Sequence, residues 1–271
     1  MLRTLFAEEI RFLAPIQLKM LGIFTVIGLV FLGVMLLDLP ILNTFALLGV
    51  VVAFLLAIPV VLVHTAAEYW QSMYGERGYL TMSIPVRGRT LYAAKVIYAF
   101  AAGLVTMCFT AVGLLVAAWA AARAQGVSVG ELFQPLHDML SLVGIGWVVG
   151  FFVYMIVELA CVIVCVAATM SIGARGRWNH FGFGAPVIGF VVLYLAAQFL
   201  SLLLLLTVPV SLELASGDIV NAWMLPDFIE AVRTGGDPTR LGLGFVAVWP
   251  LLAVVVGTWG VRSIERHTSL R

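Results

Sequence analysis

Six long apolar runs dominate this sequence and set the strongest limit on what the chain can fold into. A window of about 19 residues finds them at about residues 18–37, 43–64, 96–120, 141–170, 186–210 and 243–261. A membrane-spanning helix needs about 20 mostly apolar residues, because the hydrocarbon core of a bilayer is about 30 Å thick. The chain is 63% hydrophobic and 11% charged, so a water-soluble fold could not bury its apolar surface. The sequence therefore predicts an all-α membrane protein with six transmembrane helices.

The length and composition exclude several other classes. Six spans of about 20 residues use most of the 271 residues, so we expect a single transmembrane domain over residues 1–271 with the lipid bilayer as its surroundings. The net charge of +1 forms no basic stripe, so no nucleic acid partner is expected. Cys108, Cys161 and Cys165 all lie inside apolar runs, which favours packing over a disulfide framework or a zinc site.

Positive charge gathers on one side of the predicted spans. Only Arg123, Arg233 and Arg240 lie on the side away from the N-terminus, which also carries most of the acidic residues. Cytoplasmic flanks of short loops are rich in Lys and Arg, so both termini are expected in the cytoplasm. The residues on the N-terminal side are Arg3, Arg11, Lys19, Arg77, Arg87, Arg89, Lys95, Arg175, Arg177, Arg262, Arg266 and Arg271.

Two segments outside the spans have amphipathic patterns. Residues 1–17 place apolar side chains near helical spacing with charges on the other face, which predicts an N-terminal interfacial helix; a frayed polar leader is the alternative. Residues 211–241 form an acidic stretch with a broken apolar run around Trp223. This run is too short to span, and we expect one or two short helices at the outer interface.

The cytoplasmic segment 68–95 is unusual for a connecting loop because it is rich in apolar residues. Gly75 and Gly78 interrupt it, and Ile84-Pro85 ends any short helix before the basic residues. Apolar patches on a soluble side mark docking surfaces. The residues behind this expectation are Tyr69, Trp70, Met73, Tyr74, Tyr79, Leu80, Met82, Ile84 and Val86.

One motif in this segment carries a resemblance to a known family. The run 74–86, Tyr-Gly-Glu-Arg-Gly-Tyr-Leu-Thr-Met-Ser-Ile-Pro-Val, is followed by basic residues and by Lys95 at the start of the third span. It resembles the first cytoplasmic loop of permeases in the second exporter class of ATP-binding cassette (ABC) transporters, the ABC-2 type. Ile84 stands where that family more often has Leu. The leader, the six spans and the outer segment are also similar to the family pattern.

This resemblance implies a function and a set of partners. The chain would be the permease subunit of an ATP-driven efflux system in a bacterial-type plasma (inner) membrane, without catalytic residues. It would form a dimer with a second copy or a sister permease, above ABC ATPase subunits. ATP and Mg would bind to the partner, and this sequence has no phosphate-binding loop of its own. The implied ATPase-coupling residues are Glu76, Arg77, Gly78, Tyr79, Leu80, Thr81, Ile84 and Pro85. Arg87, Arg89 and Lys95 have a competing explanation as topology anchors.

Glu158 is the main intramembrane candidate, because a carboxylate inside a span must face protein or water or be protonated. It suggests an alternative function as an autonomous ion-coupled secondary carrier. The competing interpretation is a structural carboxylate hydrogen-bonded near Tyr154 on the same helix face. His64 and Glu68 stand four residues apart, but two ligands do not make a metal site. A membrane-embedded enzyme would need clustered polar residues within the spans, which the sequence lacks.

Overall fold

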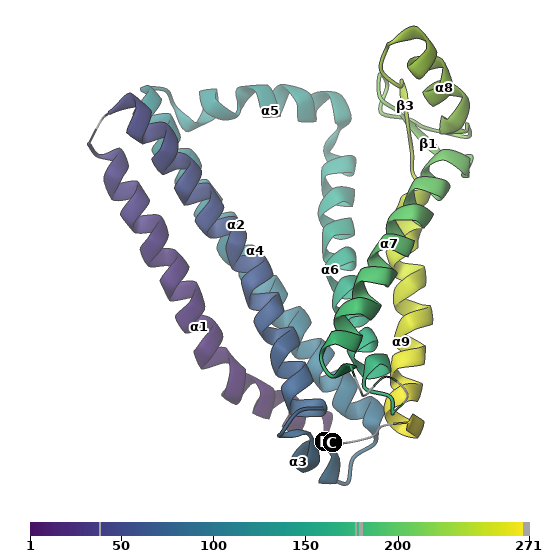
Figure 1. Ribbon diagram of the computed structural model, residues 1–271. Helices are drawn as coiled ribbons and strands as arrows, with labels where there is room; N and C mark the ends of the chain where they lie inside the picture. Colours follow the sequence, from purple (N-terminus) through teal and green to yellow (C-terminus); the bar gives the residue numbers. More distant parts are fainter. Residues whose placement is uncertain (38, 177, 179–180, 268–271) are drawn as a thin grey trace. The chain divides into compact units, whose positions relative to one another are not determined.

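A computed structural model describes residues 1–37, 39–176, 178 and 181–267 of the chain. Asp38, and Arg177 and Arg271 of the basic set, lie outside these residues. The structure is 82% helical. Figure 1 shows long helices joined by short segments, with a small sheet near one end of α7.

The six predicted spans are confirmed as helices long and apolar enough to cross a membrane. The last of them starts with the short 3-10 helix η2 (Gly244–Ala247). Several helices extend beyond the predicted apolar runs, because polar turns at their ends continue the same helix. Their bounds are α1 (Leu2–Met35), α2 (Pro40–Met73), α4 (Gly88–Gln125), α6 (Ile145–Gly173), α7 (Gly184–Thr207) and α9 (Val248–His267).

The chain folds as two compact units, Met1–His137 and Asp138–Ser269. The division lies within helix α5 (Val129–Val143). In the first unit, α1, α2 and α4 pack against one another in all three pairs. In the second unit, α6 packs against α9 and α7.

The ring of Phe54 packs against glycines of two neighbouring helices in the core of the first unit. Phe54 of α2 is buried with Val50 and Ala117. A Cβ on Gly28 of α1 would lie 2.8 Å from the Phe54 ring, and one on Gly113 of α4 would lie 2.2 Å from it. Only glycine fits at these two positions, so the three helices approach closely around one large side chain, which is the usual packing of membrane helices.

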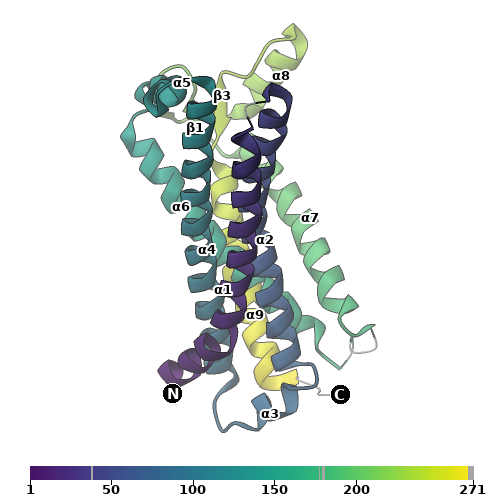
Figure 2. The same ribbon diagram turned by 90° about the vertical axis from the view of Figure 1, so that its left-hand side faces the viewer.

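Helix α1 differs from the sequence-based expectation at its start. The helical expectation for residues 1–17 is confirmed, but that segment does not end before the first span, because one helix runs from Leu2 to Met35. Pro15 lies within it, and proline is the usual cause of a sharp helix kink. Figure 2 shows the first turns of α1 at an angle to the rest. The predicted leader and the first span are therefore one bent helix.

The fourth span begins later than predicted. The apolar run from residue 141 is divided at Gly144, whose φ of 84° lies in the left-handed region that favours glycine. The residues before it form α5, a helix that the sequence analysis did not predict. Ser128 and Glu131 cap its start: the Ser128 N–H donates to the Glu131 carboxylate at 2.7 Å, and the Glu131 N–H donates to the Ser128 hydroxyl at 3.2 Å. These bonds form a capping box and lower the pKa of the Glu131 carboxyl.

The outer segment 211–241 contains one of the expected helices, α8 (Met224–Thr234), together with strands that the sequence analysis missed. Strand β1 (Ser211–Glu213) lies between β2 (Ile219–Val220) and β3 (Arg240–Gly242) in an antiparallel sheet. Ser211 pairs with both Val220 and Gly242. Strands of two or three residues are too short to show an alternating pattern, so the all-α expectation was wrong for this segment.

Candidate functional site

The segment 68–95 is a folded helical turn that joins two spans. It consists of the last turn of α2, the six-residue helix α3 (Gly78–Ser83) and the first turns of α4. Gly75 makes the reversal after α2, where a Cβ would lie 2.9 Å from the Gln71 Cα, and its carbonyl accepts the Gly78 N–H at 2.8 Å. The glycines that interrupt the sequence motif therefore shape the turn.

Aromatic side chains from both spans support this turn from inside. Tyr69, Met73 and Tyr74 at the end of α2 are buried, as is Tyr92 of α4. The ring of Tyr69 meets those of Tyr74 and Tyr92 with centroid distances of 6.3 and 6.4 Å. Tyr69, Met73 and Tyr74 were counted in the predicted docking patch, but the structure places them in the interior of the turn, where they fix its shape.

The exposed part of the turn is a smaller apolar surface on α3 and the residues that flank it. Tyr79 and Leu80 are 74% and 69% exposed. We define the α3 surface as the exposed residues Glu76, Tyr79, Leu80, Ile84 and Pro85. All five belong to the predicted set of coupling residues.

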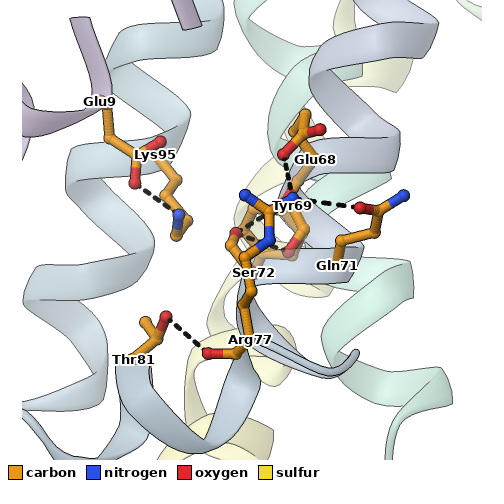
Figure 3. Close-up of polar contacts among 8 residues, drawn as sticks. All are labelled: Glu9, Glu68, Tyr69, Gln71, Ser72, Arg77, Thr81 and Lys95. Carbon is orange, nitrogen blue, oxygen red and sulfur yellow. Dashed lines mark hydrogen bonds and ion pairs between the residues drawn. The ribbon is translucent and has the colours of Figure 1, made fainter. Parts of the chain in front are cut away.

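Arg77, predicted as a contact residue, bonds back to the end of α2, with 39% of its side chain exposed. Its Nη2 donates to Glu68 Oε2 at 2.7 Å and to Gln71 Oε1 at 3.1 Å (Figure 3). The same guanidinium lies 5.0 Å from the ring centroid of Phe12 on α1. The Arg77 carbonyl accepts the Thr81 hydroxyl at 3.3 Å. Arg77, the buried Gly78 and Thr81 therefore hold α3 in place, whereas the residues of the α3 surface face outward.

Lys95 is also buried, with 8% of its side chain exposed. Its Nζ lies 2.5 Å from Glu9 Oε1 of α1 (Figure 3). Arg87 and Arg89, grouped with it as topology anchors, are exposed. The sequence analysis did not single out Glu9 or Phe12, because a partner 86 residues away in the sequence leaves no local pattern.

A buried chain of polar groups continues from Lys95 along the same helices. The Tyr98 hydroxyl of α4 donates to Gln17 Oε1 of α1 at 2.7 Å, and Gln17 Nε2 donates to the Thr65 hydroxyl of α2 at 2.8 Å. Thr65 donates in turn to the Val61 carbonyl at 2.7 Å. Buried polar groups inside a membrane need such partners, and this chain satisfies them while joining three helices.

Glu158 lies in the second unit, on α6. Tyr154, one turn earlier on the same helix, lies near its carboxyl group. Its Oε2 atom is buried, with no partner in the part of the chain that the structure describes. The Tyr154 ring meets Phe245 edge-on at 6.2 Å. One carboxylate oxygen is therefore left for a proton or a ligand.

His64 and Glu68 do not form a metal site with other residues. Glu68 is bonded to Arg77, and among the residues that the structure describes no three His, Cys, Asp or Glu side chains are close enough to share an ion.

Comparisons with models of known protein families, with curated proteins and with solved structures found no match.

Proposed function

We propose that this chain is the membrane-spanning subunit of an ATP-driven exporter of the ABC-2 type. The α3 surface carries the proposal. It exposes Tyr79 and Leu80 on a short helix between two spans. Arg77, directly before this helix, bonds to Glu68 and contacts Phe12, and these contacts hold the helix in position. A rigid apolar surface with a charged edge suits a protein partner.

The proposed orientation places α3 and both termini in the cytoplasm. Within the first unit, α3 lies at the same end of the helices as the start of α1 (Figures 1 and 2). The exposed Arg87 and Arg89 belong to this end, and basic residues favour the cytoplasmic side. The first turns of α1 would then lie at the inner interface of a bacterial-type plasma membrane.

The proposed mechanism transmits force through this turn. An ATPase subunit that binds ATP and Mg closes and displaces α3, which is joined directly to α2 and α4. Because those helices are rigid elements, a small displacement at α3 moves both spans and lets a substrate leave outward. The permease pairs with a second copy or with a sister permease, and this chain contributes no catalytic group.

Affinity purification tests the proposal. The tagged chain in mild detergent is compared with the Tyr79→Ala/Leu80→Asp variant, and co-purifying proteins are identified. The matched control is Phe228→Ala/Val232→Asp, which makes the same kinds of change at exposed residues of α8. We expect an ATPase with the wild type and the control, and at least about tenfold less with the α3 variant, equal to about 1.4 kcal/mol.

Absence of an ATPase from every preparation would contradict the proposal and favour the secondary carrier instead. The unpartnered Oε2 of Glu158 is the observation behind that second function, because a buried carboxylate in a span can carry a proton. Uptake of protons by vesicles that contain the chain would then be lost in Glu158→Gln and retained in Glu158→Asp.

A further inference from the structure

The first turns of α1 contact both ends of the turn that carries the α3 surface. Glu9 pairs with Lys95 on α4, after α3. Phe12 lies under Arg77, directly before α3. Glu9 and Phe12 are three residues apart on one helix and are therefore neighbours on its surface. Two adjacent side chains of α1 thus reach two residues that lie 18 positions apart in the sequence, Arg77 and Lys95.

Further contacts seat these turns of α1 against the spans. The ring of Phe6 meets Tyr98 at a centroid distance of 6.4 Å, Leu13 is buried, and Gln17 bonds to Tyr98 and Thr65. Residues 6, 9, 13 and 17 recur at spacings of three and four, so they share one helix face. We name this set, together with Phe12, the N-terminal bracket: Phe6, Glu9, Phe12, Leu13 and Gln17.

Helix α3 cannot hold its own position. It has six residues, and isolated helices shorter than about 12 residues are marginal in water. Its main fixed points are the residues that flank it, of which Arg77 and Lys95 contact the bracket. In the pair formed by Lys95 the lysine is buried and Glu9 is 21% exposed, so removal of the Glu9 charge leaves a buried lysine without its counter-ion.

We propose that the N-terminal bracket is a positioning element that holds the α3 surface in its binding geometry. In an exporter of the proposed type, the bracket also moves with α3, so that the first turns of α1 belong to the coupling apparatus. This second statement rests on the proposed function, whereas the first concerns the chain alone.

Amide hydrogen exchange of the full chain in lipid nanodiscs tests the first statement without any ATPase. The variant is Glu9→Gln, and the matched control is Glu8→Gln, whose carboxylate forms an exposed pair with Arg11 at 3.5 Å. In Glu9→Gln we expect exchange in residues 78–83 to be at least about fivefold faster, with α6 and α9 unchanged. In Glu8→Gln we expect less than a twofold change.

A charge exchange separates positioning from general damage. The double variant Glu9→Lys/Lys95→Glu reverses the ion pair and is expected to return exchange in residues 78–83 to within about twofold of the wild type. Equal effects of Glu8→Gln and Glu9→Gln, or no recovery in the double variant, would overturn the proposal.

The complex with the co-purified ATPase tests the second statement. Addition of ATP, Mg and vanadate should change exchange in both residues 78–83 and residues 2–17 of the wild type, and only in residues 78–83 of Glu9→Gln. A wild-type response confined to α3 would refute movement of the bracket. If no ATPase is ever found, the proposed function fails, while the nanodisc result still decides whether the bracket positions α3.

Discussion

Gln17 shows how a single polar residue can be placed inside an apolar helix bundle. Its amide uses both ends, accepting from Tyr98 and donating to Thr65, and the residue is buried. An unmade hydrogen bond in such a site costs the desolvation of the remaining group. The buried amide therefore specifies how α1, α2 and α4 are aligned, because only one alignment satisfies it.

The Tyr98→Phe variant, which lacks a single oxygen atom, tests the contribution of the hydrogen bond to Gln17. The change removes the hydroxyl and leaves Gln17 Oε1 without its donor, so we expect a loss of about 1 kcal/mol in stability. Thermal unfolding in detergent measures it as a lower midpoint. The control is Tyr194→Phe on α7, where the side chain is 45% exposed; an equal effect there would show that the bond to Gln17 contributes nothing specific.

The sequence could single out the residues of the candidate site but not what each of them contacts. The motif around Tyr79 and Leu80 identified the exposed residues, because glycine spacing and a proline are local signals. Arg77 and Lys95 also stood out as charges. Their partners Phe12 and Glu9 could not be found, since contacts between distant segments depend on how the helices pack.

Helix α8 is joined to the small sheet by hydrogen bonds to one carboxylate. Asp227 accepts the Thr239 N–H and hydroxyl, both at 2.8 Å, and the Arg240 N–H at 3.1 Å. These hydrogen bonds to the ionised form, with that of the Thr239 hydroxyl the largest cause, lower the pKa of the Asp227 carboxyl. The stability of the contact between α8 and the sheet therefore depends on pH in the acid range.

The sign of that dependence follows from the lowered pKa. Because the folded pKa lies below the unfolded value of about 3.9, the contribution of Asp227 is complete above pH 4 and is lost as the pH falls through the folded pKa. In Asp227→Asn, we expect amide exchange of residues 224–242, corrected for intrinsic pH effects, to be several-fold faster at pH 7. The variant should lose the wild type's change in protection below pH 4. Asp237→Asn, at an exposed site, is the control; the same change there would exclude this role for Asp227.

The long, apolar helices could be predicted from the sequence, whereas the short elements could not. All six long helices follow from the apolar runs. The strands of segment 211–241 are too short for a periodic signal. Helix α5 was not predicted, and its last residues were counted in the fourth run because Gly144 interrupts that run without a change in polarity. The continuity of α1 through Pro15 was missed because a proline usually ends a helix pattern.

At the scale of the whole molecule, the order of the candidate spans predicts that α3 and α8 lie on opposite sides of the membrane. Between them the chain contains three candidate spans, α4, α6 and α7, and an odd number of crossings changes sides. With α3 cytoplasmic, a cysteine at position 228 should react with a membrane-impermeant maleimide on intact cells. One at position 80 should react only after permeabilisation.

This experiment needs a background without the native Cys108, Cys161 and Cys165, checked for normal folding. Labelling of position 80 but not 228 in intact cells would reverse the proposed orientation. The number of candidate spans was available from hydropathy alone, whereas the side that each loop faces stays a prediction from the distribution of basic residues. The close packing around Phe54 was not, because glycine and phenylalanine are common throughout such a sequence.

The ion pair between Glu9 and Lys95 also constrains how the protein is made. The two residues are 86 positions apart, so at roughly 5–20 residues per second the ribosome delivers Lys95 on the order of ten seconds after Glu9. During that interval the nascent chain carries a carboxylate whose buried partner does not yet exist. The first turns of α1 can dock only after the third span has entered the bilayer, so the surface built on α3 is completed late in biogenesis, when three spans are already in place.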